Sequence, residues 1–339
     1  MDWAKSYSSS WRVYRVNRDT WADAEMLENV DSVSITKTAD GSLLESGSLE
    51  ITGEVEPDYY RIVMTAEQSG EVVRVDVATL LFGVTGGKYD YGRIAQKLDG
   101  HSVLYPASTT TIIAGEYAPA GVDGVKYAAD LLAGAINAPV ETMGSFTLND
   151  HLVHEMGSTV LEAVWAVLNA GPDGGWVIQI DGRGVVHIVP RPTEPALILD
   201  STSTRLLTNG IEYTTDISAI PNRYIVIVDE NRTVAVNSDA SSSISTVSRG
   251  YNVDMVDESP TAVDGETLSA YARRRLKEES VMKDERTYTR EYAPNVYMYS
   301  IVRASIEGLQ GDLRVGSQTI TCDKGIKVQE KASREISLW

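Results

Sequence analysis

The stretch PNRYIVIVDENRTVAVNSD, residues 221–239, decides the class of fold. An apolar run from Tyr224 to Val228 is followed by three polar residues and by a second apolar-rich run from Arg232 to Val236. Two such runs separated by a short polar segment are typical of paired antiparallel strands. We therefore predict a β-hairpin here, with Asp229-Glu230-Asn231 as its turn.

An amphipathic helix is predicted after this hairpin, in DGETLSAYARRRLKEES at residues 264–280. Asp264 is placed to cap it. Its apolar residues recur at helical spacing, namely Leu268, Tyr271, Ala272 and Leu276. The basic run Arg273-Arg274-Arg275 with Lys277 lies on the other side. Because Glu278 and Glu279 balance it, we interpret it as a solvated helix face rather than a site for an acidic partner.

Further strands are predicted around this helix, at Ile211–Thr215, Thr287–Tyr292, Val296–Val302, Asp312–Val315, Gln318–Cys322 and Ile326–Glu330. Several short strands with one helix packed on them favour a small barrel or sandwich. Residues 201–339 are therefore predicted to form a β-barrel-like domain.

The first part of the chain, residues 1–95, has the same character. Strands are predicted at Trp11–Val16, Val33–Lys37, Leu49–Ile51, Tyr60–Met64 and Val73–Phe82. The acidic segment Trp21–Asp31 is expected to form a helical turn. Glycines at 83, 86 and 87 are expected to interrupt the strand pattern, whose character changes after Tyr91. We predict a first β-barrel-like domain here.

The middle of the chain, residues 96–200, mixes helix with strand. Asp123 and Ser158 are each placed to cap a helix with a wide apolar stripe. A tight hairpin is predicted from Trp176–Ile180 and Val185–Val189, with its turn at Asp181-Gly182. Prolines at 190, 192 and 195 then favour a linker or edge crossing, because proline donates no ladder hydrogen bond. The predicted fold is thus mainly β, with two small β-barrel-like domains flanking an α+β insert.

Composition restricts the function. The chain has 339 residues, 48 Asp plus Glu against 30 Lys plus Arg, and a formal net charge of -18. Such a balance disfavours conventional binding to nucleic acid, because phosphates are repelled. Cys322 is the single cysteine, so the chain forms no internal disulfide, which suits assembly in a reducing cytoplasm. No signal peptide is apparent, and no run approaches the roughly 20 apolar residues of a membrane span.

Candidate catalytic and metal-binding residues are few. His151 and His154, next to Asp150 and Glu155, share a helix face if this segment is helical, but no third or fourth zinc ligand follows nearby. His101 and His187 stand alone in strand-like surroundings.

The glycine-rich pieces 83–87 and 171–175 match neither phosphate-binding nor dinucleotide-binding motifs. We predict no catalytic residue, no metal site and no cofactor. A catalytic pair of carboxylates is the one enzyme site that the composition does not exclude, because glycoside hydrolysis needs only two acids at the right separation. A carbohydrate-binding or carbohydrate-active β protein is therefore the alternative interpretation.

The order of these motifs resembles the tail hub or baseplate hub proteins of long-tailed bacteriophages, which are related to the hub portion of type VI secretion spike proteins. The resemblance rests on several stretches in order: LLESGSLEITGEVEPDYYRIVM (43–64), HSVLYPAS (101–108), STVLEAVWAVLNAGPDGGWVIQIDGRGVVHIVPRP (158–192), PNRYIVIVDENRTVAVNSD (221–239), GYNVDMVDE (250–258), DGETLSAYARRRLKEES (264–280) and GDLRVGSQTITCDKGIKVQE (311–330). It covers the chain from about residue 30 to 335.

This resemblance implies a structural, non-enzymatic protein of the virion. It implies a homotrimeric ring in which two barrel-like domains per subunit match a hexameric tail tube to a threefold tip. The implied partners are the tail tube protein, the distal tail protein, the tape measure protein and tip, fibre or spike proteins. Genome DNA would pass through the acidic lumen without specific binding. Because no lytic or fibrous region follows the predicted hub before Trp339, we expect those activities to reside in separate chains.

Overall fold

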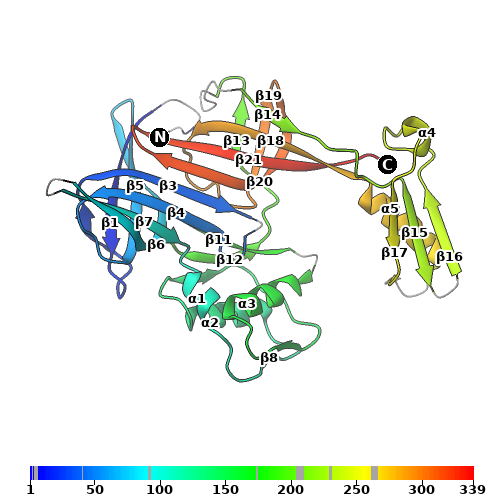
Figure 1. Cartoon of the computed structure of the whole chain (residues 1–339), viewed down its shortest axis with the longest axis horizontal. Helices are drawn as coiled ribbons and strands as arrows, with labels where there is room; N and C mark the ends of the chain where they lie inside the picture. The colour runs from blue at the N-terminus through cyan, green and yellow to red at the C-terminus, as the bar shows by residue number, and fades with distance from the viewer. Residues whose placement is uncertain are drawn as a thin grey trace. The chain divides into compact units, whose positions relative to one another are not determined.

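The computed structural model describes residues 1, 3, 7–39, 41–90, 93–172, 175–203, 210–228, 231–260 and 266–339. The chain forms two compact units (Figure 1). The first contains Met1–Ile211 and Thr287–Ala332, and the second contains Glu212–Arg286 and Ser333–Trp339. The chain therefore leaves the first unit, builds most of the second, returns, and ends in the second. The division into domains at residues 95 and 200 stays a prediction.

A large, mostly antiparallel sheet dominates the first unit. Its strands are β1 (Ser8–Val16), β2 (Asp23–Leu27), β3 (Val30–Thr38), β4 (Glu45–Thr52), β5 (Asp58–Gln68), β6 (Glu71–Asp90), β7 (Arg93–His101), β13 (Pro195–Asp200), β18 (Val281–Glu291), β19 (Ile301–Ile306), β20 (Leu309–Cys322) and β21 (Ile326–Ser337). The order is β14-β18-β21-β20-β3-β4-β7-β6-β5-β1-β2, with β19 beside β20 and β13 beside β19. The short edge strand β14 (Glu212–Thr214) belongs to the second unit. Strands β18 and β21 continue into the second unit.

The first and last parts of the chain share this sheet. Strand β20 pairs with β3, which places Ile320 opposite Ile35 and Cys322 opposite Val33. All four side chains are buried in one hydrophobic cluster. The predicted mainly β class is confirmed, whereas closure of either part into a barrel stays a prediction.

The middle region is α+β, as predicted. It contains α1 (Tyr105–Thr109), β8 (Glu116–Ala118), α2 (Gly124–Ala133), β9 (Val140–Thr142), β10 (Leu152–His154), α3 (Val160–Asn169), β11 (Trp176–Ile180) and β12 (Val186–Pro190). Strands β11 and β12 form the predicted hairpin. They lie between the helices and the large sheet (Figure 1). Their residues Ile178 and Ile188 join one core with Leu132 and Leu168 of the helices and Tyr59 of the sheet.

Local sequence explains where the two longer helices of this region begin. Asp123 caps α2, as predicted, and accepts hydrogen bonds from the Val125 and Lys126 amides. Helix α3 is capped by Thr159 rather than by Ser158. Thr159 and Glu162 form a reciprocal capping box, in which each side chain accepts from the other residue's backbone amide. Two orphan amide donors are thereby satisfied, which favours Thr159 over its neighbour.

The second unit contains β14 (Glu212–Thr214), β15 (Arg223–Val228), β16 (Asn231–Val236), α4 (Thr246–Arg249), β17 (Asp254–Asp257) and α5 (Leu268–Glu279). Strands β15 and β16 form the predicted hairpin, and α5 buries Tyr271 and Leu276 against Tyr224 and Val226. Thr267 caps α5 by accepting from the Ala270 amide. The predicted cap Asp264 and the hairpin turn residues 229–230 lie outside the described residues.

Four other local predictions were wrong. Segment 21–31 contains strand β2 instead of a helical turn, because it pairs with β1 and sets Leu27 opposite Val13. Strand β6 runs through Gly83, Gly86 and Gly87, because β7 supplies ladder partners along this whole stretch. The segments 312–315 and 318–322 belong to the single strand β20, and 296–300 precedes β19 instead of belonging to it.

A buried polar cluster lies between β18, β20 and β21. Arg290 Nη2 and Gln318 Nε2 each donate to Glu330 Oε2 at 2.6 Å, and the Tyr288 hydroxyl donates to the other oxygen. Burial alone would raise the pKa of Glu330, but the Arg290 charge and these hydrogen bonds outweigh it and lower the pKa. The two charges are paired inside the sheet, so removing one partner leaves the other buried without a counter-charge.

We predict that Arg290→Met lowers the free energy of unfolding by about 3–5 kcal/mol, because Glu330 would remain buried without its counter-charge. Urea unfolding measures this. The matched control is Arg303→Met, which removes another arginine–carboxylate pair across neighbouring strands, with Asp312, on the surface. The control should be nearly silent. Equal effects of the two substitutions would contradict the prediction.

Candidate functional site

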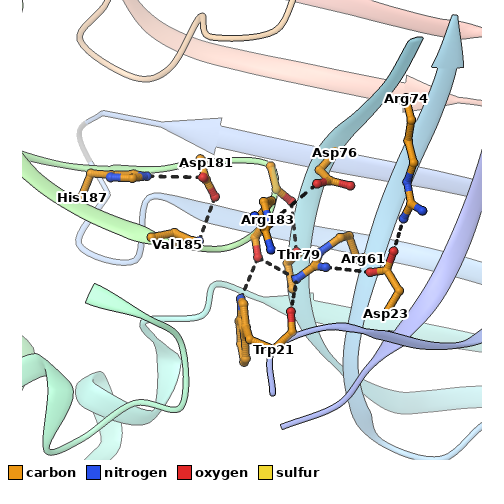
Figure 2. Close-up of polar contacts among 11 residues, drawn as sticks. Trp21, Asp23, Arg61, Arg74, Asp76, Thr79, Asp181, Arg183, Val185 and His187 are labelled. Atoms are coloured by element: carbon orange, nitrogen blue, oxygen red, sulfur yellow. Dashed lines mark hydrogen bonds and ion pairs between the residues drawn. The ribbon is translucent and has the colours of Figure 1, made fainter. Parts of the chain in front are cut away.

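A cluster of polar contacts forms where the β11–β12 turn meets β5 and β6 (Figure 2). We call this cluster the joint; it comprises Arg61, Thr79, Asp23, Trp21 and the turn residues 181–184. The turn sequence Asp181-Gly182-Arg183-Gly184 connects the two strands of the hairpin. Gly184 has φ +77°, a conformation that favours glycine. The joint connects the middle region to the large sheet, and all its residues belong to the first unit.

Arg61 of β5 is the centre of this joint, and only 2% of it is exposed. Its Nη1 donates to Asp23 Oδ1 at 2.6 Å, and its Nη2 donates to the carbonyl oxygens of Trp21 and Arg183 at 3.1 and 3.0 Å. Its Nε donates to Thr79 Oγ1 at 3.1 Å. The Arg61 guanidinium thus connects β5 by hydrogen bonds to the β1–β2 connection, to β6 and to the hairpin turn.

The hairpin turn approaches β6 at backbone distance. The Thr79 hydroxyl donates to the Gly182 carbonyl at 3.0 Å, and the Trp21 indole donates to the Arg183 carbonyl at 2.8 Å. A Cβ at Gly182 would lie 1.8 Å from the Asp76 carbonyl oxygen. Glycine is therefore required here by close packing.

Charged residues surround the buried contacts. Asp23 accepts a second guanidinium, that of Arg74. Asp76 lies 4.0 Å from the Arg183 Nε, and burial raises the pKa of Asp76. The carboxylates of the joint are thus matched by arginines from neighbouring segments.

His187 of β12 connects two acids. Its Nε2 lies 3.3 Å from Asp181 and its Nδ1 lies 3.5 Å from Glu141. The hydrogen bond to Asp181 raises the pKa of His187 despite burial. Burial would raise the pKa of Asp181, but the hydrogen bonds from His187 and from the Val185 amide outweigh it, and the pKa falls. Protonated His187 therefore stabilises the turn.

A hollow of about 300 Å³ lies beside the joint. Its lining includes Asp76, Asp181, Arg183, Tyr292 and Tyr297. Burial raises the pKa of Tyr297 to about 12, so its phenol stays protonated near neutral pH. Asp76 and Asp181 interact with arginine and histidine side chains as described above. These contacts hold the joint together.

The structure separates the candidate metal ligands of the sequence. His154 lies in strand β10 instead of a helix, is buried, and stacks on Tyr127 with ring centroids 6.0 Å apart. His151 lies just before this strand and is exposed. Across the described ranges, no group of three or more His, Cys, Asp or Glu residues is placed to hold a metal ion.

The other candidates have structural surroundings. His101 stacks on Tyr105 with ring centroids 4.3 Å apart. Arg274 and Arg275 form ion pairs with Glu278 and Glu279 of the same helix, so the predicted balance of the basic run by these glutamates is confirmed. Cys322 is buried, and burial raises the pKa of its thiol to about 12. No helix in the described part of the chain is long and apolar enough to cross a membrane.

The joint was not predicted from the sequence. Its one available signal was Arg61, a charged residue inside the apolar strand sequence DYYRIVM. A charge in a buried strand implies a partner elsewhere in the chain. The sequence does not indicate that Asp23, Trp21 and Arg183 provide it, because these residues are up to 122 positions away.

Solved structures share this fold over nearly the whole chain. The 43 kDa tail protein of prophage MuSo2 from Shewanella oneidensis matches with TM-score 0.60 and 14% identity, covering 96% of this chain and 98% of that one. A tail protein from Neisseria meningitidis MC58 matches with TM-score 0.61 and 13% identity, covering 97% of both. At these identities the likeness is one of fold.

A chain of the Francisella PdpA–VgrG complex also matches, with TM-score 0.56 and 8% identity. The match covers 97% of this chain and 58% of that one. No protein-family model and no curated protein matches the sequence. The resemblance of this sequence to phage tail proteins is therefore confirmed at the level of the fold, across nearly its full length.

We predict that Gly182→Ala destabilises the protein by about 1–3 kcal/mol, because the new methyl group would overlap the β6 backbone. Thermal unfolding measures the change. Gly83→Ala is the control, since a Cβ there meets no atom within 4 Å. A silent Gly182→Ala would show that the turn does not pack closely on β6.

We also predict a pH-dependent contribution from His187. Because its pKa is raised in the folded state, its contribution is complete below its ordinary pKa of about 6.5 and is lost as the pH rises through the folded-state value. His187→Gln should therefore lower the free energy of unfolding by up to about 1 kcal/mol at pH 5.5 and by less at pH 8.5. The exposed His151→Gln is the control. A cost that does not depend on pH would refute the ionic role.

Proposed function

We propose that this chain is a structural hub protein of a phage tail or a phage-like particle, and that it acts in assembly and not as an enzyme. The observation that carries the proposal is the correspondence over 96–97% of this chain with two tail proteins. Both of those chains are also matched almost completely, so the likeness extends beyond one shared domain.

In this proposal three copies close into a ring. The strands from the first and last parts of the chain would supply two barrel-like domains per subunit, so that three subunits present six similar units to a hexameric tube. The domain limits 1–95, 96–200 and 201–339 belong to this proposal. The ladder between β3 and β20 supports this proposal, because the ladder joins the two strand-rich parts of the chain into one continuous sheet.

The charge of the chain supports a passive role toward DNA. A net charge of -18 repels phosphates, so a lumen lined by this protein would let genome DNA pass without specific binding. The proposed partners are the tail tube, distal tail and tape measure proteins, together with a tip, fibre or spike protein. The match to a chain of a PdpA–VgrG complex supports placement of this chain in a comparable multi-protein complex.

We predict that the purified chain forms particles of about 111 kDa, because three copies of the 37.0 kDa chain make the ring. Light scattering coupled to size exclusion measures the mass, and negative-stain images would show threefold rings. Dilution and added salt should be varied, because salt screens the repulsion between acidic copies. A monomer whose melting temperature rises with glycans would contradict the hub and favour the carbohydrate-binding alternative.

A further inference from the structure

The second unit has a three-stranded sheet with one covered side. The strand order is β16-β15-β17, and helix α5 packs on the side that carries Tyr224 and Val226. Successive residues of a strand point to opposite sides, so Ile225 and its alternate neighbours lie on the other side. This second side is where an isolated two-layer structure would carry polar residues.

Apolar residues occupy this second side of the β16-β15-β17 sheet instead. Ile225 lies opposite Val234 of β16 and beside Val256 of β17, which makes an apolar row across all three strands. Val234 is 41% exposed and Val256 is 51% exposed. We call this row, with Arg223, Arg232 and Asp254 at its borders, the sheet face.

The charges at the borders distinguish the sheet face from the rest of the acidic chain. Arg232 lies opposite Ile227 on one side of the row, and Arg223 forms an ion pair with Asp254 at 3.3 Å on the other. Among the described residues, two arginines and one aspartate border the row, a summed charge of +1, while the whole chain carries -18. An acidic surface of another copy would complement it.

A second exposed apolar pair lacks this property. Tyr117 of β8 and Val153 of β10 lie opposite each other and are 61% and 69% exposed. Between residues 102 and 190 the sequence has nine Asp and Glu but only two Lys and Arg. A second acidic copy would be repelled there, so this pair does not suit contact between identical chains.

We propose that the sheet face is a contact surface between subunits and that its occupant is a second copy of this chain. The apolar row would be buried, and Arg232 would approach carboxylates of the neighbouring copy. The inference rests on the proposed ring, because it names the surface that holds the ring together. Apolar rows with charged borders are typical of the centre and rim of stable interfaces.

We predict that Val234→Asp and Val256→Asp each raise the concentration at which the oligomer dissociates by about tenfold or more, because each places a carboxylate in the apolar centre. Light scattering over a dilution series measures this. Val247→Asp is the matched control, because Val247 is an exposed valine of the same unit on helix α4. Circular dichroism checks that each variant folds.

A second measurement does not depend on disruption. Val234→Cys should react with a maleimide at least about tenfold more slowly in the oligomer than after dilution to monomers, whereas Val247→Cys should react equally fast in both. Cys322 is buried and gives little background. If the wild-type chain is monomeric, the proposed hub fails. If it is a trimer and the Val234 variants behave like the Val247 variants, the ring stands and the sheet face is excluded from the interface.

Discussion

The ladder between β3 and β20 is the constraint on which the first unit depends. It sets Ile35 opposite Ile320, although the two residues are separated by most of the chain. Because the buried side chains of both strands belong to one cluster, neither part can bury its apolar residues in this way without the other. The middle region and most of the second unit are therefore insertions in the sequence between strands of one sheet. That sheet is complete only when strands from the last part of the chain pair with it.

Two kinds of polar interaction then stabilise this sheet. Around Glu330, side chains of neighbouring strands satisfy a buried carboxylate within the sheet itself. Around Arg61, a single guanidinium connects the sheet to the hairpin of the middle region and to the β1–β2 connection. Buried charges are costly unless every partner is present, so both clusters favour one specific arrangement of the chain. A single favoured arrangement suits a protein whose proposed role is structural.

The proposed function and the proposed contact surface follow from different observations. The first rests on a fold shared nearly end to end with tail proteins, and the second on an uncovered apolar row in the second unit. A structural hub has to present surfaces to identical copies and to other proteins at once. The two arginines that border the sheet face and the acidic surroundings of the Tyr117–Val153 pair offer a physical way to separate these two kinds of contact.

The sequence by itself determined the local elements whose causes are local. Alternation predicted the hairpins 176–190 and 223–236, and apolar spacing predicted α2, α3 and α5, with Asp123 as a correct cap. Tertiary structure decided what depends on distant partners. Strand β2 and the glycine-containing part of β6 are extended because β1 and β7 lie beside them, and the Arg61 joint assembles from segments far apart in the chain. Local propensity is a weak preference that ladder pairing and burial override, and only the folded chain reveals those partners.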